Sequence, residues 1–351
     1  MPSATEPPWP ARLSAYATVS AALGLLSDRR IADAVAAAPA LGSGIGGRSA
    51  ELEVEGVRVF VKRVPLTDLE LRPENVRSTA NLFDLPLFYQ YGVGSAGFGA
   101  WRELAAHLMA NGWVLRGEYA GFPLLYHWRI LPDRPPTGFV DELGGVEGAV
   151  ERWEGSAAVR ERLEAIGRSS SSLVLFLEHV PQTLAAWLGE NRDAVPWVEE
   201  AVTSGAAFMS SRGFVHFDAH FLNLLTDGRR VYFADFGLAL SSHFELAPEE
   251  ADFLTDHLVY DRSYVPTHLL RHHLVKRAAE NVDLRTFLRD WTAGRRPAGV
   301  PPQTAEIIDR HARTALVFDD FVHGLLTRTK RTPFPAADVR AALNGTPAQQ
   351  S

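Results

Sequence analysis

The stretch His216–Asn223 reads His-Phe-Asp-Ala-His-Phe-Leu-Asn, and Asp235–Gly237, which reads Asp-Phe-Gly, begins twelve residues after it ends. The residues between the two motifs form two short apolar runs that turn at Asp227-Gly228, which predicts a β-hairpin. A tight hairpin brings the residues at its two ends close together. We therefore expect the end of the first motif and the start of the second to lie side by side.

Three oxygen-bearing side chains in these motifs suit magnesium-dependent phosphoryl transfer. That reaction needs a group that orients the acceptor hydroxyl and hard oxygen ligands for Mg²⁺ on the phosphates. Asp218 could accept the hydroxyl proton, while Asn223 and Asp235 could ligate the metal. The alternative is that all three are ordinary turn residues.

With a lysine upstream on a predicted strand, the two motifs resemble the catalytic loop and metal-binding motif of the protein-kinase-like superfamily. That group includes the aminoglycoside- and choline-type phosphotransferases and bacterial Ser/Thr-kinase-like proteins. The resemblance implies a two-lobed α+β fold with a sheet-rich small lobe and a helical large lobe, and ATP and Mg²⁺ as cofactors. It implies that Asp218 is catalytic, that His216 braces its loop, and that Asn223 and Asp235 bind the metal. His220 stands where Ser/Thr kinases carry lysine, so it could touch the γ-phosphate or merely pack.

The lysine of this resemblance is Lys62. Glu51–Glu55 and Val57–Lys62 both alternate, and Gly56 lies between them, which predicts a hairpin with Lys62 at the end of its second strand. The resemblance implies that Lys62 pairs with the α- and β-phosphates. Taken alone, Lys62 could equally be an exposed lysine at a strand end.

A glycine-rich segment, Leu41–Gly47, precedes that hairpin. Its glycines Gly42, Gly44 and Gly47 would let backbone N–H groups approach a phosphate closely. We predict a phosphate-binding loop here, and an ordinary flexible turn is the alternative.

A glutamate on a helix should hold the lysine in place. We predict Glu103, in the helix expected over Ala100–Gly112, although it follows Lys62 by 41 residues. Glu74 is the alternative, but it follows Pro73 in a poor helical context.

Another glycine pattern, Gly92–Gly97, fits the dinucleotide-binding fingerprint and precedes the same helix. That interpretation needs a preceding strand, which is doubtful, and it leaves the later motifs unexplained. A loop that leads into the helix is the preferred interpretation.

Downstream, Ser172–Val180 resembles the last strand of the small lobe as it enters the interlobe hinge. The backbone at Glu178 and Val180 would then meet the adenine edge.

The sequence departs from regulated protein kinases in ways that bear on the acceptor. Phe217 replaces the arginine that reads an activation-loop phosphate, and Ala247-Pro248-Glu249 begins only ten residues after Gly237. A full peptide-docking segment does not fit there. Phe60 replaces the small residue that usually covers adenine. Asp-Phe-Gly itself is nearer to protein kinases, so the evidence on the acceptor points both ways.

Composition sets wider bounds. The 351 residues include no cysteine, which excludes disulfides and thiolate metal sites and suits a reducing cytoplasm. The formal charge is -7 without a long basic run, so no nucleic-acid partner is expected. We expect neither a signal peptide nor a membrane span, because the apolar stretch near the N-terminus is short and interrupted.

The expected organisation has four parts. Residues 1–40 form a helical extension, and residues 41–178 form the small lobe with insertions near 64–99 and 132–172. Residues 179–345 form the helical lobe, and residues 346–351 form a tail. The leading functional hypothesis is transfer of the γ-phosphoryl group of ATP to a hydroxyl of a small molecule. A Ser/Thr kinase for a protein or biosynthetic precursor peptide is the second hypothesis, and a pseudokinase binding module is the third.

Overall fold

The computed structural model describes residues 9–44, 46–92, 94–275 and 283–345. The expected tail at 346–351 and the first eight residues of the expected extension lie outside the described residues. The chain divides into two compact units. The first comprises residues 1–181, 234–239 and 244–247, and the second comprises 182–233, 240–243 and 248–351. The fold is α+β, with a five-stranded antiparallel sheet in the first unit and mostly helices in the second.

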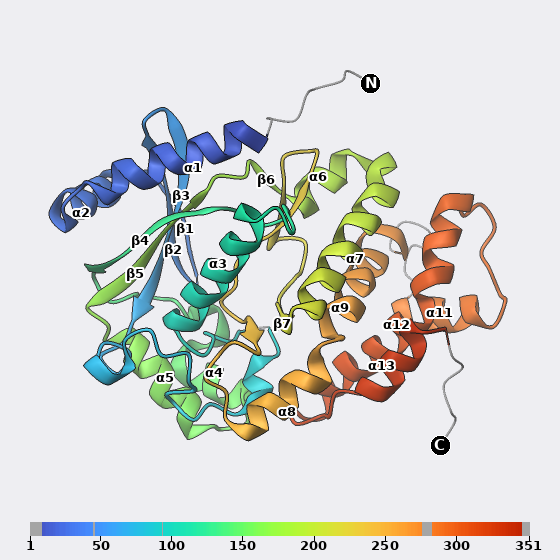
Figure 1. Ribbon diagram of the computed structural model, residues 1–351. Helices are drawn as coiled ribbons and strands as arrows, with labels where there is room; N and C mark the ends of the chain where they lie inside the picture. The colour runs from blue at the N-terminus through green and yellow to red at the C-terminus, as the bar shows by residue number, and fades with distance from the viewer. Residues whose placement is uncertain (1–8, 45, 93, 276–282, 346–351) are drawn as a thin grey trace. The chain divides into compact units, whose positions relative to one another are not determined.

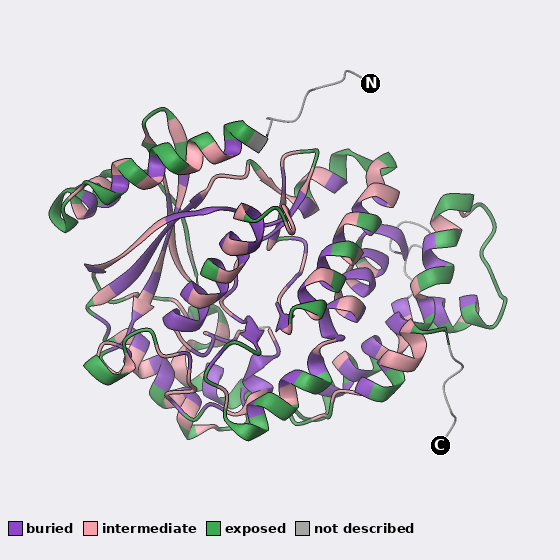
Figure 2. Ribbon diagram, in the orientation of Figure 1, coloured by how far each residue is buried: buried purple, intermediate pink, exposed green. Residues whose placement is uncertain are grey.

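The sheet of the first unit has the strand order β1-β2-β3-β5-β4, and all neighbours are antiparallel. Its strands are β1 (Ala40–Gly44), β2 (Gly47–Val54), β3 (Val57–Leu66), β4 (Leu125–Pro132) and β5 (Ser171–Glu178). Figure 2 shows that the central strands of this sheet are mostly buried. The sheet therefore forms the core on which the first unit is built.

The glycine-rich segment differs from the prediction, because part of it is a strand. Ala40–Gly44 forms β1 and pairs with β2, where Gly44 lies opposite Gly47. The strand was missed because it lacks buried alternation, and Leu41 is 54% exposed. Lys62 therefore lies on the third strand, and that strand continues to Leu66 instead of ending at the lysine.

The two faces of β3 meet different helices. Helices α1 (Trp9–Gly24) and α2 (Asp28–Ala37), which lie within the predicted extension, contact β2 and β4. Helix α3 (Ala100–Leu115) packs on the other face, as Figure 1 shows. Since alternate residues of a strand point to opposite faces, Lys62 lies on the face of α3.

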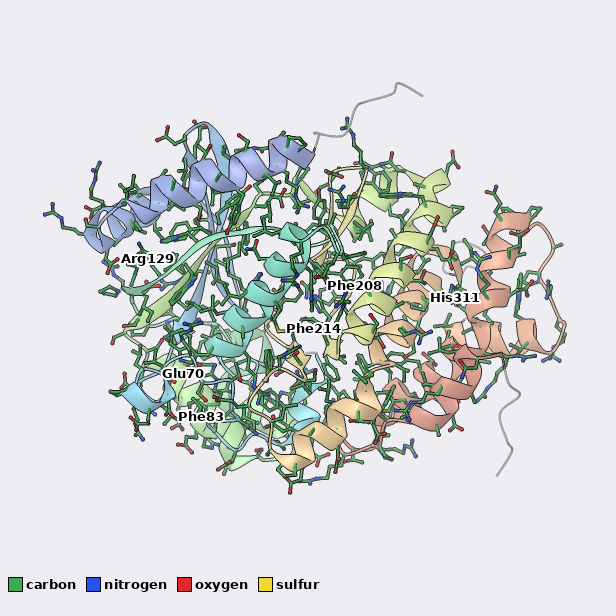
Figure 3. The ribbon with its side chains drawn as sticks, viewed as in Figure 1. Glu70, Phe83, Arg129, Phe208, Phe214 and His311 are labelled. Atoms are coloured by element: carbon green, nitrogen blue, oxygen red, sulfur yellow. The ribbon has the colours of Figure 1, made fainter. Side chains whose placement is uncertain are left out.

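Both predicted insertions contain short helices. The first holds the 3₁₀ helices η1 (Pro73–Asn75) and η2 (Leu87–Gln90), and the second holds η3 (Asp141–Leu143), α4 (Gly145–Arg152) and α5 (Ala157–Gly167). They are tied together by a buried ion pair, in which Arg162 lies 2.8 Å from Glu70 and its guanidinium stacks over the ring of Phe83. Figure 3 labels Glu70 and Phe83 in this part of the unit.

The second unit is mainly helical. Its strands are β6 (Gln182–Thr183), β7 (Phe214–Val215), β8 (Leu224–Thr226), β9 (Val231–Phe233) and β10 (Leu240–Ser241). Its helices are α6 (Leu184–Glu190), η4 (Arg192–Ala194), α7 (Val195–Ser211), α8 (Pro248–His257), α9 (Tyr260–Leu269), the π-helical η5 (Leu270–Val275), α11 (Leu284–Thr292), α12 (Pro302–Thr327) and α13 (Ala336–Leu343). Strands β8 and β9 pair, which confirms the hairpin predicted between the two motifs. Within the described part of the chain, no helix has the length and apolarity needed to cross a membrane.

The Asp-Phe-Gly segment does not follow the predicted boundary. Residues 234–239 cluster with the first unit, although the prediction assigned 179–345 to the helical lobe. Two contacts explain this: Gly97 packs so closely on the carbonyl of Gly237 that a Cβ there would collide, and the side chain of Gln90 donates to the carbonyl of Leu238. The first insertion thus holds this segment against the sheet-containing unit.

Candidate active site

The structure brings together three predicted site residues that are far apart in the sequence. The Nζ atom of Lys62, on β3, lies 2.6 Å from Oε1 of Glu103 and 2.8 Å from Oδ1 of Asp235. Lys62 and Glu103 are buried, whereas the side chain of Asp235 is 42% exposed. One ammonium group is therefore held between a buried carboxylate and a carboxylate that solvent can reach.

The charges of this trio determine the protonation of the lysine. Burial by itself would lower the pKa of Lys62, but the carboxylates of Asp235 and Glu103 outweigh it and hold the pKa above its ordinary value. Burial raises the pKa of Glu103, and the ammonium group of Lys62 opposes that shift. The lysine therefore carries a positive charge throughout the neutral range.

Helix α3 supplies the glutamate partner, as predicted. Glu103 lies in its first turn, whereas the alternative Glu74 lies in the 3₁₀ helix η1 and is exposed. One turn further along α3, His107 packs edge-on against Phe236, with ring centroids 4.8 Å apart. A single helix thus contacts both Lys62 and the Asp-Phe-Gly motif.

The start of α3 is fixed by Glu70, which the sequence did not single out. Its Oε1 accepts a hydrogen bond from the backbone N–H of Ala100 at 2.8 Å, and its Oε2 accepts from Thr67 and from Arg162. A carboxylate at a helix N-terminus satisfies free N–H groups and is favoured by the helix dipole. The first insertion is therefore part of the support of Glu103.

Gly46, which precedes β2, lies beside the lysine. A Cβ added at Gly46 would lie 3.6 Å from Nζ of Lys62, so the backbone approaches the amine here. At Gly47 the φ angle is +120°, and a Cβ would collide with the carbonyl oxygen of Arg63. Gly42 and Gly44 lie on β1. The structure therefore brings the backbone of Gly46 next to the amine of Lys62 and gives Gly47 a position that only glycine fits.

Both motifs contain a left-handed residue that is not glycine. The φ angle is +62° at Asp235 and +64° at Phe217. Such conformations cost about 1–3 kcal/mol and cluster at functional sites. The backbone N–H of Gly237 turns back to Oδ1 of Asp235 at 3.3 Å. The backbone conformation at Phe217, next to Asp218, and at Asp235 is therefore maintained at an energetic cost.

The dinucleotide interpretation of Gly92–Gly97 is wrong. The segment before it is the 3₁₀ helix η2 rather than a strand, so no βαβ unit starts here. Gly97 instead packs on Gly237, and the loop leads into α3.

The contacts of Glu178 limit how its backbone could meet an adenine edge, as predicted for the hinge. The backbone N–H of Glu178 donates to the carbonyl of Leu124 at 2.8 Å, so this N–H is engaged within the first unit. The carboxylate of Glu178 is held by Arg12. Val180 follows β5 and is partly exposed. Any contact of Glu178 with a base edge must therefore use its carbonyl group.

The four residues predicted for the catalytic loop lie together in the second unit. The Nδ2 of Asn223 donates to Oδ2 of Asp218 at 2.9 Å and to its backbone carbonyl at 3.1 Å. The Nε2 atom of His220 lies 3.6 Å from Oδ1 of Asp218. His216 is fully buried, and its Nδ1 accepts from the N–H of Asp218 at 3.3 Å. The structure therefore brings these four predicted residues together.

A buried aspartate on α9 anchors this loop. Asp261 is 2% exposed, and its two oxygens accept the backbone N–H groups of His216 at 2.6 Å and Phe217 at 3.1 Å. Burial raises the pKa of Asp261 to about 7, against the effect of those two hydrogen bonds. The sequence offered no signal for this residue, because its partners lie about 45 positions away.

Removing this anchor should destabilise the second unit. Asp261→Ala removes the carboxylate that accepts these two N–H groups, so we expect a loss of roughly 2–6 kcal/mol in the free energy of unfolding, measured with urea. Asp261→Asn keeps one acceptor oxygen and should lose about half as much. Asp283→Ala, which removes an exposed helix cap, is the control and should cost about 1 kcal/mol.

The same residue gives a pH dependence. Because its folded pKa, about 7, exceeds its ordinary value of 3.8, the stabilisation is present in acid and is lost as the pH rises towards 7. The stability advantage of the parent over Asp261→Asn should therefore shrink between pH 4 and 7. An advantage that grows over that range would contradict the assignment.

Asn223, in the second unit, and Asp235, in the first, each offer an oxygen atom of the kind that magnesium prefers. Because the amide nitrogen of Asn223 is used on Asp218, its amide oxygen is the atom left to ligate. Asp235 offers a partly exposed carboxylate, and Mg²⁺ prefers such oxygen ligands. Among the residues described, no group of three or more His, Asp or Glu side chains forms a metal site by itself.

Comparison of the chain with known protein families and with curated proteins gives no match.

Proposed function

We propose that this chain is an ATP- and Mg²⁺-dependent phosphotransferase of the protein-kinase-like class, with the two units as its small and large lobes. The observation that carries the proposal is the trio around Lys62. A buried, charged lysine on the third strand lies within 3 Å of a helix glutamate and of the Asp-Phe-Gly aspartate, next to a glycine turn. That set of groups suits a triphosphate with its metal.

The residues then take the following roles. Lys62 binds the α- and β-phosphates and Glu103 holds it in place. Asp235 and Asn223 ligate the metal, which when bound neutralises charge that develops on the phosphates. Asp218 orients the acceptor hydroxyl and accepts its proton, and His216 braces the loop. His220, 3.6 Å from Asp218, is placed to steady that carboxylate.

The particular acceptor we propose is a hydroxyl of a small molecule. Helix α8 begins at Pro248, eleven residues after Gly237, and Leu240–Ser241 pairs with β7 on the way. Glu245 is also engaged, because its N–H donates to Thr79 and its carboxylate accepts from Ser78. The segment between Gly237 and Pro248 is short and its residues already make contacts within the chain, so few residues remain to bind a peptide. A Ser/Thr kinase for a protein or precursor peptide is the second candidate, and Asp-Phe-Gly favours it.

Labelled ATP tests the proposal. The protein is incubated with [γ-³²P]ATP and Mg²⁺, once with a panel of hydroxylated small molecules and once with a cell lysate. We expect label in a small molecule. Label in polypeptide would establish the second candidate instead. Absence of transfer together with Mg²⁺-independent or absent ATP binding would overturn the proposal in favour of a binding module.

A further inference from the structure

Arg12 of the N-terminal helix α1 makes several hydrogen bonds to the end of β5 and to the segment that precedes β4. Its Nε lies 2.7 Å from Oε1 of Glu178 and its Nη2 lies 2.6 Å from Oε2. Nη1 donates to the carbonyl of Ala120 at 2.9 Å, and Nη2 also donates to the carbonyl of Phe122. Arg12 is 6% exposed, so this arginine is an internal part of the first unit and not a surface charge.

The carboxylate of Glu178 accepts a further hydrogen bond besides those from Arg12. Oε2 of Glu178 also accepts the backbone N–H of Leu124 at 2.9 Å, while the N–H of Glu178 donates to the carbonyl of Leu124. Arg12 and Glu178 therefore bind the end of β5 to the segment 120–124 that precedes β4. A guanidinium group does this because its planar set of donors reaches a carboxylate and two carbonyl groups at once.

The segment 120–124 also contacts the Asp-Phe-Gly motif. The ring of Phe122 packs against Phe236, with centroids 6.0 Å apart. One arginine from the N-terminal extension thus supports both the strand end where a nucleotide base is expected and the phenylalanine next to Asp235. General stabilisation of the sheet would not require both.

We propose that α1 is a positioning element of the nucleotide site and that Arg12, through Glu178, sets the end of β5 against the base of the nucleotide. This inference rests on the proposed function. Arg12 touches neither base nor phosphate in it. It fixes the strand end on which discrimination between bases depends.

The test is Arg12→Lys, which keeps the charge but loses the planar set of donors. The matched control is Arg129→Lys. Arg129, labelled in Figure 3, pairs with Asp28 of α2 at 3.2 Å, is partly exposed and touches neither Glu178 nor the segment 120–124. The dissociation constants of MgATP and MgGTP are measured by displacement of a fluorescent ATP analogue, with thermal unfolding in parallel.

We expect the parent to prefer ATP. Arg12→Lys should weaken ATP binding by about tenfold to a hundredfold, because small misplacements at a binding site have effects of that size, and should weaken GTP binding less. The ratio of the GTP to the ATP dissociation constant should therefore fall in Arg12→Lys. Arg129→Lys should keep the dissociation constants of the parent. If Arg12→Lys does not fold, Arg12→Gln combined with Glu178→Gln removes both charges together and should narrow the preference in the same way.

Three results would overturn the inference: unchanged ATP affinity, equal weakening of both nucleotides, or no preference in the parent. Equal weakening of ATP and GTP binding would mean that the contacts of Arg12 with Glu178 only stabilise the first unit. Failure of the proposed function is seen separately, because the parent itself would then bind neither nucleotide in a Mg²⁺-dependent way.

Discussion

Asp218→Asn should lower the turnover number by about 10²–10⁴ while the affinity for MgATP stays within about twofold of the parent, because a general base contributes roughly that factor to the chemical step. Asparagine has nearly the same shape and retains an oxygen that can accept the hydrogen bond of Asn223. It cannot take up the proton of the acceptor hydroxyl. The loss should therefore fall on catalysis and leave binding in place.

The measurement is the rate of γ-phosphoryl transfer to the acceptor found in the labelling experiment, together with a binding titration. Asp252→Asn, which changes an exposed carboxylate on α8, is the control and should behave as the parent. A turnover number equal to that of the parent would remove Asp218 from the mechanism. A parallel loss of ATP binding would show that the residue acts on the loop and not on the proton.

The candidate site residues that the sequence predicts are those marked by motifs and turns within short stretches of the chain. Asp218 and Asn223 lie in one loop. The Asp227-Gly228 turn predicts the hairpin that leads to Asp235. Glu103 could be chosen over Glu74 because helix α3 has a clear pattern while Pro73 breaks the other segment. In each case local rules of helix and turn formation carried enough information.

The residues that were missed depend on tertiary contacts. Arg12 meets Glu178 across 166 positions, and Glu70 meets Arg162 across 92. Asp261 lies in a helix whose sequence gives no hint that its carboxylate receives backbone N–H groups of a distant loop. No periodicity or motif encodes such pairs, since a buried charge has a partner only once the chain is folded.

Strand β1 was missed for a different reason. Ala40–Gly44 has no alternation of apolar residues, and its glycines disfavour a strand. Its backbone pairs with β2 at the edge of the sheet, so hydrogen bonding and not side-chain burial defines it. Moving Lys62 from the second strand to the third follows from this one element. The same pairing places Gly46 beside the amine.

Asp235→Asn should abolish the Mg²⁺-dependent part of ATP binding. In the parent, a nucleotide at 100 times its dissociation constant stabilises the folded state by about 2.7 kcal/mol, which a thermal-shift titration with ATP detects. The substitution removes the charge that ligates the metal while keeping the shape of the side chain. We expect the shift with ATP and Mg²⁺ to fall to that seen with ATP and a chelator.

The control is Asp33→Asn, which changes an exposed carboxylate of α2 in the same unit and should leave the magnesium-dependent shift intact. Asp235 also pairs with Lys62 at 2.8 Å, so the substitution removes part of what holds the pKa of the lysine high. Glu103 remains 2.6 Å from that amine, and Lys62 should therefore stay charged. Any ATP binding left in the variant is then the share carried by Lys62 and the glycine turn. Equal magnesium-dependent shifts in variant and parent would mean that Asp235 only pairs with the lysine and ligates no metal.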